Sequence, residues 1–186
     1  HLFSSAASDV YKRQGEGFKA IKKAMDRIEN ASDMEAKLIK ALYTLYDKDA
    51  YPDAKQRDQA YLTEMRQLNR DYPNDPDIAA LYASSYMSIQ RWNYWGDQGE
   101  SISETLSVAE ALEHIMSKDL SHPGVLHLHI HLIEASAEPE RALVAADNLE
   151  RTIPIVGHVV HMPSHIYVRV GQYQNCLLYT SPSPRD

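Results

Sequence analysis

The chain has 186 residues, of which 44% are hydrophobic, and it carries a formal net charge of −7 at pH 7. An acidic chain without a basic stripe argues against nucleic acid or an anionic membrane as its partner. Its single cysteine excludes a disulfide framework, and no apolar run approaches the roughly 20 residues that cross a bilayer.

The two ends of the chain do not look like natural protein. Residues 4–14 resemble the in-frame translation of a transposase sequencing adapter, and residues 176–186 resemble the translation of the opposite adapter. Both matches are unbroken, so we expect 1–14 and 176–186 to be non-native and 15–175 to be the authentic segment. The alternative is that the ends are natural flexible tails. A fragment of this kind does not reveal the compartment, and the authentic segment would have no cysteine of its own.

Apolar residues recur at helical spacing along nearly the whole authentic segment. The sequence predicts helices over 17–29, 32–46, 54–72, 78–90, 102–118, 123–136, 139–152 and 156–170. Ser32, followed by Glu35, forms a capping-box pattern at the second of these helices. Residues 91–101 are predicted to be a loop that ends in a cap at Ser101 or Ser103. The expected fold class is therefore all-α, with helix–turn–helix units in series.

One stretch alternates with period two, at 125–133 (VLHLHIHLI). Read as a strand, its His127-x-His129-x-His131 pattern is typical of metallohydrolases. The flanks favour a helix, because Pro123 is a good helix start and the following residues are strong helix formers. No other strand is predicted that could complete a sheet.

A repeat is visible along the chain. Residues 166–173 resemble the tetratricopeptide pattern, with Gly171 and Tyr173 at a turn after a helix that carries a small residue, Ser164, and an aromatic one, Tyr167. Steps of 34 residues, with insertions of about 13 and about 8, keep further small residues at Ala83 and Ala41 in phase. Three units thus share one register.

The segment 15–175 as a whole resembles a bacterial family of tetratricopeptide-repeat proteins. The matching pieces are 91–95 (RWNYW), 127–136 (HLHIHLIEAS), 139–149 (PERALVAADNL) and 157–167 (GHVVHMPSHIY). The chain departs from the family at Gln90-Arg91, where proline is more usual before the first tryptophan. The resemblance implies a right-handed α-solenoid of tetratricopeptide-like repeats. The family is named for its repeats and not for an activity.

Seven of the nine histidines fall between His122 and Gly171. In the repeat register, the inner face of two neighbouring helices carries His127, His131 and Glu134 on the first, and His158, His161, His165 and Arg169 on the second. His129 faces the paired helix and is expected to be buried and hydrogen-bonded. His114 and His122 are expected to be surface or capping residues outside the cluster.

Three functions are open for this inner face. The leading prediction is a scaffold that binds a peptide or protein partner in a concave groove formed by these seven residues. The alternative is a divalent transition metal (zinc, iron, manganese or copper), held by the five histidines and Glu134 and able to activate water. A metal-free, hydrogen-bonded seam between repeats is the third. The sequence assigns no catalytic residue, and the HExxH metalloprotease signature is absent.

Two local features bear on this face. Pro163 lies inside a predicted helix and should kink it between His161 and His165, because proline cannot donate the helical hydrogen bond. Trp92, Tyr94 and Trp95 lie in the predicted loop, and we expect them to pack against a neighbouring repeat. The functional alternative is a flap over the groove.

Overall fold

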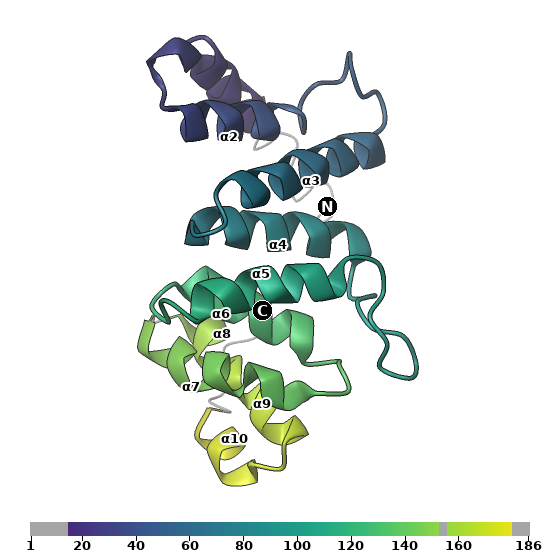
Figure 1. The fold of residues 1–186 in the computed structure, drawn as a ribbon, viewed down its shortest axis with the longest axis vertical. Coiled ribbons are helices and arrows are strands. Elements are labelled where there is room, and N and C mark those ends of the chain that lie inside the picture. The colour runs from purple at the N-terminus through teal and green to yellow at the C-terminus, as the bar shows by residue number, and fades with distance from the viewer. Residues whose placement is uncertain (1–14, 153–155, 180–186) are drawn as a thin grey trace, which may run out of the picture. The chain divides into compact units, whose positions relative to one another are not determined.

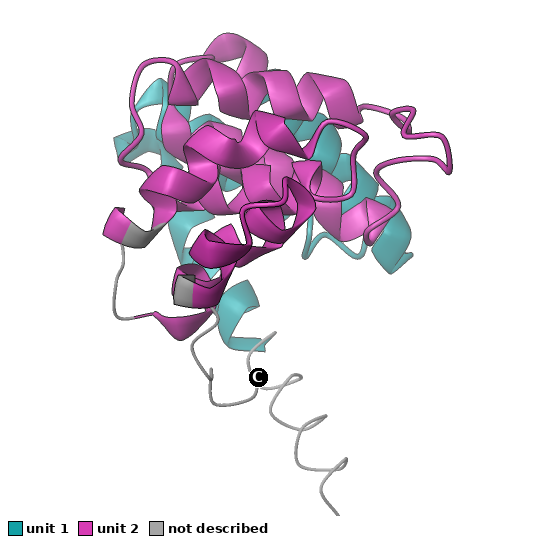
Figure 2. Cartoon of the chain, turned by 90° about the horizontal axis from the view of Figure 1, so that it is seen from below, with its two compact units in different colours: residues 1–68 teal, residues 69–186 magenta. Residues whose placement is uncertain are grey.

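The computed structural model describes residues 15–152 and 156–179, and over these residues the chain forms helices and no strands. The predicted all-α class is therefore confirmed. The chain divides into two compact units, His1–Leu68 and Asn69–Asp186, which are coloured separately in Figure 2. Among the described helices, none has both the length and the apolar character needed to cross a membrane. Residues 1–14 and 180–186, which hold most of the predicted adapter sequence, lie outside the described residues.

The first unit contains a helix over 15–25, a short 3₁₀-helix η1 (Ile28–Asn30), helix α2 (Asp33–Tyr43) and most of helix α3 (Ala54–Asp71). The predicted capping box is present at α2. The backbone N–H of Ser32 donates to the Glu35 carboxylate at 2.8 Å, and the backbone N–H of Glu35 donates to the Ser32 hydroxyl at 3.3 Å. These bonds satisfy backbone donors that have no partner within the helix.

The second unit holds the remaining helices, which follow one another in space as they do in sequence (Figure 1). They are α4 (Pro76–Gln90), α5 (Thr105–Met116), α6 (Pro123–Ile133), 3₁₀-helix η2 (Pro139–Ala142), α7 (Leu143–Thr152), α8 (Gly157–His161), α9 (Pro163–Arg169) and α10 (Tyr173–Tyr179). Helix α4 contacts α5, α5 contacts α6, α6 contacts α7 and α7 contacts α9. Helix α6 also contacts α4 and α9, so these three lie beside one another.

Two helices of this unit begin in the same way. Asp75 caps α4 and His122 caps α6, each through a side chain that accepts from a backbone N–H three residues on, and each is followed by proline. Proline suits this first position because its missing N–H would have no helical partner. The core between the helices is built from fully buried large side chains, which include Tyr86, Leu112, Leu126, Ile130, Leu149 and Ile166.

Some boundaries differ from those predicted. Helix α5 begins at Thr105 and has no side-chain cap, so the expected cap at Ser101 or Ser103 was wrong. The reason is that residues up to 104 belong to the preceding loop, in which the Ile102 N–H donates to the Tyr94 carbonyl at 2.9 Å. The predicted helix 123–136 ends at Ile133, and the helix predicted from 139 starts with a 3₁₀ turn.

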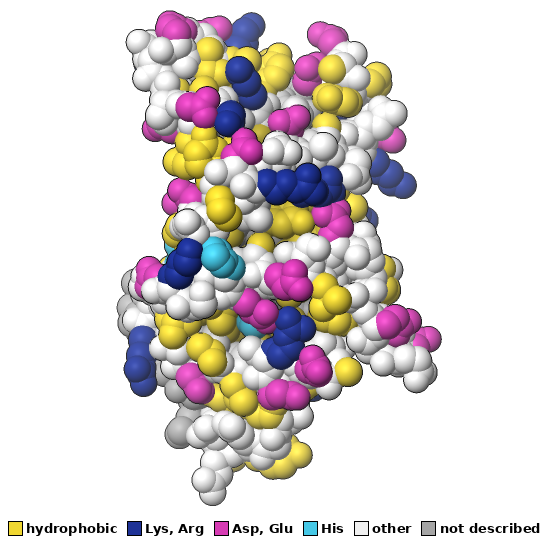
Figure 3. Space-filling model, in the orientation of Figure 1, with side chains coloured by type: hydrophobic (Ala, Val, Ile, Leu, Met, Phe, Trp, Pro, Cys, Tyr) yellow, Lys and Arg dark blue, Asp and Glu magenta, His cyan; other side chains and the backbone are white. Residues whose placement is uncertain are grey.

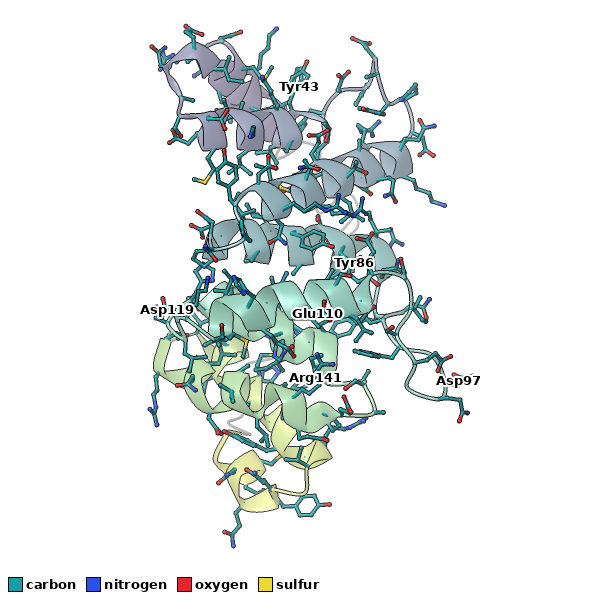
Figure 4. The ribbon with its side chains drawn as sticks, viewed as in Figure 1. Tyr43, Tyr86, Asp97, Glu110, Asp119 and Arg141 are labelled. Carbon is teal, nitrogen blue, oxygen red and sulfur yellow. The ribbon has the colours of Figure 1, made fainter. Side chains whose placement is uncertain are left out.

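The loop 91–104 folds back on itself through an isolated bridge between Trp95 and Ser101, and Figure 4 shows Asp97 at its outer end. Gly99 adopts a φ of +79°, and a Cβ there would come within 2.6 Å of the Ala137 Cβ, so this position requires glycine. Tyr94 is buried and Trp95 donates from Nε1 to the Leu132 carbonyl at 2.6 Å. These two aromatics thus pack within this unit, as expected, while the division of its helices into repeats stays a prediction.

Candidate metal centre

The candidate site lies where α6 meets α8 and α9. Helix α6 presents His127 and His131 one turn apart, and Glu134 follows at its C-terminal cap. Helix α8 carries His158 and His161, and helix α9 carries His165. We call these five histidines and Glu134 the histidine cluster. The strand interpretation of residues 125–133 is wrong, because the alternating histidines lie on a helix and only two of the three face the cluster.

Pro163 divides what the sequence predicted as one helix into α8 and α9, as its missing N–H leads one to expect. The break falls at Met162, whose backbone stays in the right-handed helical region. The turn is therefore shallow enough to keep His161 and His165 together. Their rings stack with centroids 5.2 Å apart, and their Nε2 atoms are 3.2 Å apart.

The tightest part of the cluster contains three histidines. The Nε2 atoms of His127 and His158 lie 3.0 Å apart. Each of His127, His131 and His158 offers one ring nitrogen, and these three nitrogens all lie within 4.8 Å of one another. Tetrahedral ligands about 2.1 Å from a zinc ion are about 3.4 Å apart, so the spacing of these nitrogens approaches that of a three-histidine site. All three side chains are half-buried.

Glu134 connects the two sides of the cluster. Its Oε1 accepts from Nδ1 of His131 at 3.3 Å, and its Oε2 accepts from Nδ1 of His165 at 2.5 Å. Burial by itself raises the pKa of this carboxyl, but the two histidine hydrogen bonds outweigh it and lower the pKa to about 2. The same interaction, chiefly the hydrogen bond, raises the pKa of His165. Glu134 is therefore a carboxylate at neutral pH.

These bonds fix the tautomers of two histidines. A carboxylate can only accept, so Nδ1 of His131 and Nδ1 of His165 must carry the protons. In the neutral rings the Nε2 atoms then carry the lone pairs, and that of His165 faces Nε2 of His161 at 3.2 Å. A carboxylate behind the Nδ1 of a histidine that ligates through Nε2 is the usual outer-shell arrangement of histidine metal sites.

His127 is kept neutral by its surroundings. Burial, and to a lesser extent the nearby His131, His158, His161 and His165, together lower its pKa to about 4. At pH 7 its imidazole has a lone pair available to a cation. The surroundings of His127 thus disfavour its protonation, whereas Glu134 favours that of His165.

The structure brings six of the seven predicted site residues together. The seventh, Arg169, lies at the edge and donates from Nη2 to the Ser136 carbonyl at 2.9 Å. Beside the cluster is a surface depression of about 510 Å³, lined by Glu134, Ala135, Ser164, His165, Val168, Arg169 and Cys176. His122 caps α6 and His114 bonds Asn74 at 2.8 Å, so both are outside the cluster as predicted.

His129 is buried and hydrogen-bonded, as predicted, but its partners could not be foreseen. Its Nε2 donates to Oε1 of Glu113 at 3.0 Å, and Arg141 donates to both oxygens of that carboxylate at 2.9 and 3.1 Å. Figure 4 shows Arg141 on the η2 segment beside α5. The His129 bond, with that of Arg141, holds the pKa of Glu113 below its usual value. This network ties α5, α6 and η2 together.

Trp92 was expected to pack away from solvent, and that was wrong, because its side chain is 63% exposed. Instead its ring meets His131 edge-on, with centroids 5.1 Å apart. The backbone of Arg91 and Trp92 holds this position with φ values of +48° and +72°. Arg91 is the left-handed C-cap of α4, and positive φ at a residue as bulky as Trp92 is uncommon and costly.

Acidic and basic side chains are interspersed over the face drawn in Figure 3, where little histidine is visible. No basic stripe shows on that face, and the absence of a nucleic-acid partner stays a prediction.

Comparison with protein-family models, with curated proteins and with solved structures finds no significant match.

Proposed function

We propose that the chain binds a divalent transition metal through His127, His131 and His158. The observation that carries the proposal is the convergence of three half-buried imidazole nitrogens within 4.8 Å of one another. Divalent copper and zinc bind a nitrogen donor set more tightly than iron or manganese do, by the Irving–Williams order of affinities. We therefore narrow the predicted metal to Zn²⁺ or Cu²⁺.

Two features of the surroundings support this proposal. His127 is neutral at pH 7, and the hydrogen bond from His131 to Glu134 leaves its Nε2 as the free ligand atom. Three protein ligands leave a fourth position for water or a small molecule, as in catalytic zinc sites. Metal binding is the proposed function, and any reaction would take place at this fourth coordination position.

We infer further that the second unit is a solenoid of tetratricopeptide-like repeats. The support is its contact pattern, in which α6 contacts both α4 and α9, α5 contacts both α4 and α6, and α7 contacts both α6 and α9. In this interpretation α4, α6 and α8–α9 are the equivalent first helices, and the histidine cluster lies on the inner face of two of them.

Binding of a peptide or protein partner is the second candidate function. It is favoured by the depression next to the cluster, where Val168 is 49% exposed and Arg169 offers a cation. Selection of displayed peptides on the full chain tests it. A selected peptide should bind the Val168→Asp and Arg169→Ala variants at least tenfold more weakly, and equal binding to all three chains would contradict it.

The metal proposal is tested by titrating Zn²⁺ into the untagged chain in competition with a chromophoric chelator. We expect one tightly bound ion, and a loss of affinity in His158→Asn that exceeds the roughly 10–100-fold cost of outer-shell changes. His114→Asn is the matched control, because that histidine lies outside the cluster. No tight binding, or equal affinity in both variants, would overturn the proposal.

A further inference from the structure

The remaining pair of histidines in the cluster has a geometry of its own. His161 and His165 are four residues apart on α8 and α9, and their Nε2 atoms face each other at 3.2 Å. Two imidazoles at this spacing can bind one ion from the same side of a helix. The metal site proposed above includes neither of these two histidines.

The orientation of His165 suits a ligand. Its Nδ1 is held by Oε2 of Glu134 at 2.5 Å, so its Nε2 is the atom that faces His161. The Ser164 hydroxyl donates to the His161 carbonyl at 2.7 Å and helps hold the turn between α8 and α9. This arrangement repeats that of His131, whose Nδ1 is bound to the other oxygen of the same carboxylate.

The two histidine sets adjoin each other. The rings of His158 and His161 meet edge-on with centroids 5.0 Å apart, and those of His131 and His165 lie 6.3 Å apart. Two cations at this distance repel each other, and the negative charge of Glu134, which is hydrogen-bonded to one histidine of each set, offsets part of that repulsion. One oxygen of Glu134 serves each set.

From this geometry we propose a second metal position at His161 and His165, which makes the cluster a two-ion centre organised around Glu134. The inference rests on the proposed site at His127, His131 and His158. With two protein ligands the second position would bind more weakly than the first, and one of its ligands, His165, also lines the depression that includes Val168 and Arg169. The ligand class it fits is a Cu²⁺ or Zn²⁺ ion that keeps water or a small anion in its remaining positions.

Copper titration of the untagged full chain, followed by elemental analysis after gel filtration and by electron paramagnetic resonance, tests this position. We expect two Cu²⁺ ions per chain, bound in order, and a half-field signal from two closely spaced ions once the second is bound. His161→Asn should keep one ion and lose the half-field signal, with unchanged circular dichroism. His114→Asn should keep both ions and the signal.

The outcomes separate the two proposals. One ion per chain, unaffected by His161→Asn, would overturn the second position and leave the first. One ion that is lost in both His158→Asn and His161→Asn would mean a single shared site, which also overturns it. Two ions in His161→Asn would place the second ion elsewhere. No bound copper in the wild-type chain would overturn both proposals.

Discussion

Oε2 of Glu134 accepts a 2.5 Å hydrogen bond from Nδ1 of His165, a residue 31 positions further along the chain. The bond joins the C-terminal end of α6 to α9 and places a carboxylate behind the histidines. Its partner oxygen makes the equivalent bond to His131. Glu134 therefore orients ligands from both helices, although the sequence suggested it as a ligand itself.

Glu134→Gln tests this orienting role. The amide cannot accept from both Nδ1 atoms, so one histidine loses its fixed tautomer. We expect zinc affinity to fall by about 10–100-fold, as outer-shell changes do. Competition titration measures it, and Glu140→Gln, an exposed glutamate on η2, is the control. Equal affinities in the two variants would show that Glu134 does not act on the metal.

The low pKa of His127 predicts a pH dependence of stability in the metal-free chain. The folded imidazole takes up a proton at about pH 4, whereas the unfolded one does so near 6.5. Between these values the unfolded state binds more protons, so the free energy of unfolding falls as the pH drops from about 6.5 to about 4. Urea unfolding in the presence of a chelator measures this fall.

The comparison variant is His127→Gln, which cannot take up that proton. Its free energy of unfolding should fall less steeply in the same pH window, and the difference from wild type should be constant above pH 7. Parallel curves for the two chains through the whole window would contradict the prediction.

Alanine variants of the three alternating histidines on α6 should differ from one another in stability and in zinc binding. His129→Ala removes a fully buried ring and the partner of Glu113, so we expect a loss of about 2–5 kcal/mol. Replacing the half-buried His127 or His131 by alanine should lower the free energy of unfolding of the metal-free chain by less than this. Either replacement should abolish tight zinc binding. Thermal unfolding and zinc titration on the three alanine variants test this. A His129→Ala chain that is folded but does not bind zinc would contradict it.

Replacing each of the two tryptophans by phenylalanine should change the free energy of unfolding by different amounts. Trp95→Phe loses the hydrogen bond to the Leu132 carbonyl and should cost about 1 kcal/mol. Trp92→Phe changes a mostly exposed ring and should stay within about 0.5 kcal/mol. Chemical denaturation measures both. A larger loss at Trp92 than at Trp95 would mean that the loop is held by the exposed ring.

Helical periodicity sufficed to predict the all-α class, and the capping pattern at Ser32 marked the start of α2. Phasing on a repeat put seven residues on two stripes, and all but Arg169 meet in the cluster, because residues one turn apart share a helical face. The break at Pro163 followed from its missing N–H. These are local properties, which a sequence carries directly.

The contacts that complete the site are not local. The bond from Glu134 to His165 and the bonds from Glu113 to His129 and Arg141 depend on how helices pack and on rotamers chosen in that packing. Nothing in the sequence around Glu113 distinguishes it from a solvent-facing glutamate. The exposure of Trp92 depends likewise on the left-handed backbone at 91–92, which no turn residue such as glycine or asparagine signals.

X-ray absorption at the zinc edge of the one-to-one complex counts the ligands of the bound ion. We predict three imidazole nitrogens at about 2.0–2.1 Å and one further light atom. We also predict that His131→Asn reduces the imidazole count by one. Failure to form a one-to-one complex, or a zinc ion with at most one imidazole in its first shell, would contradict these predictions.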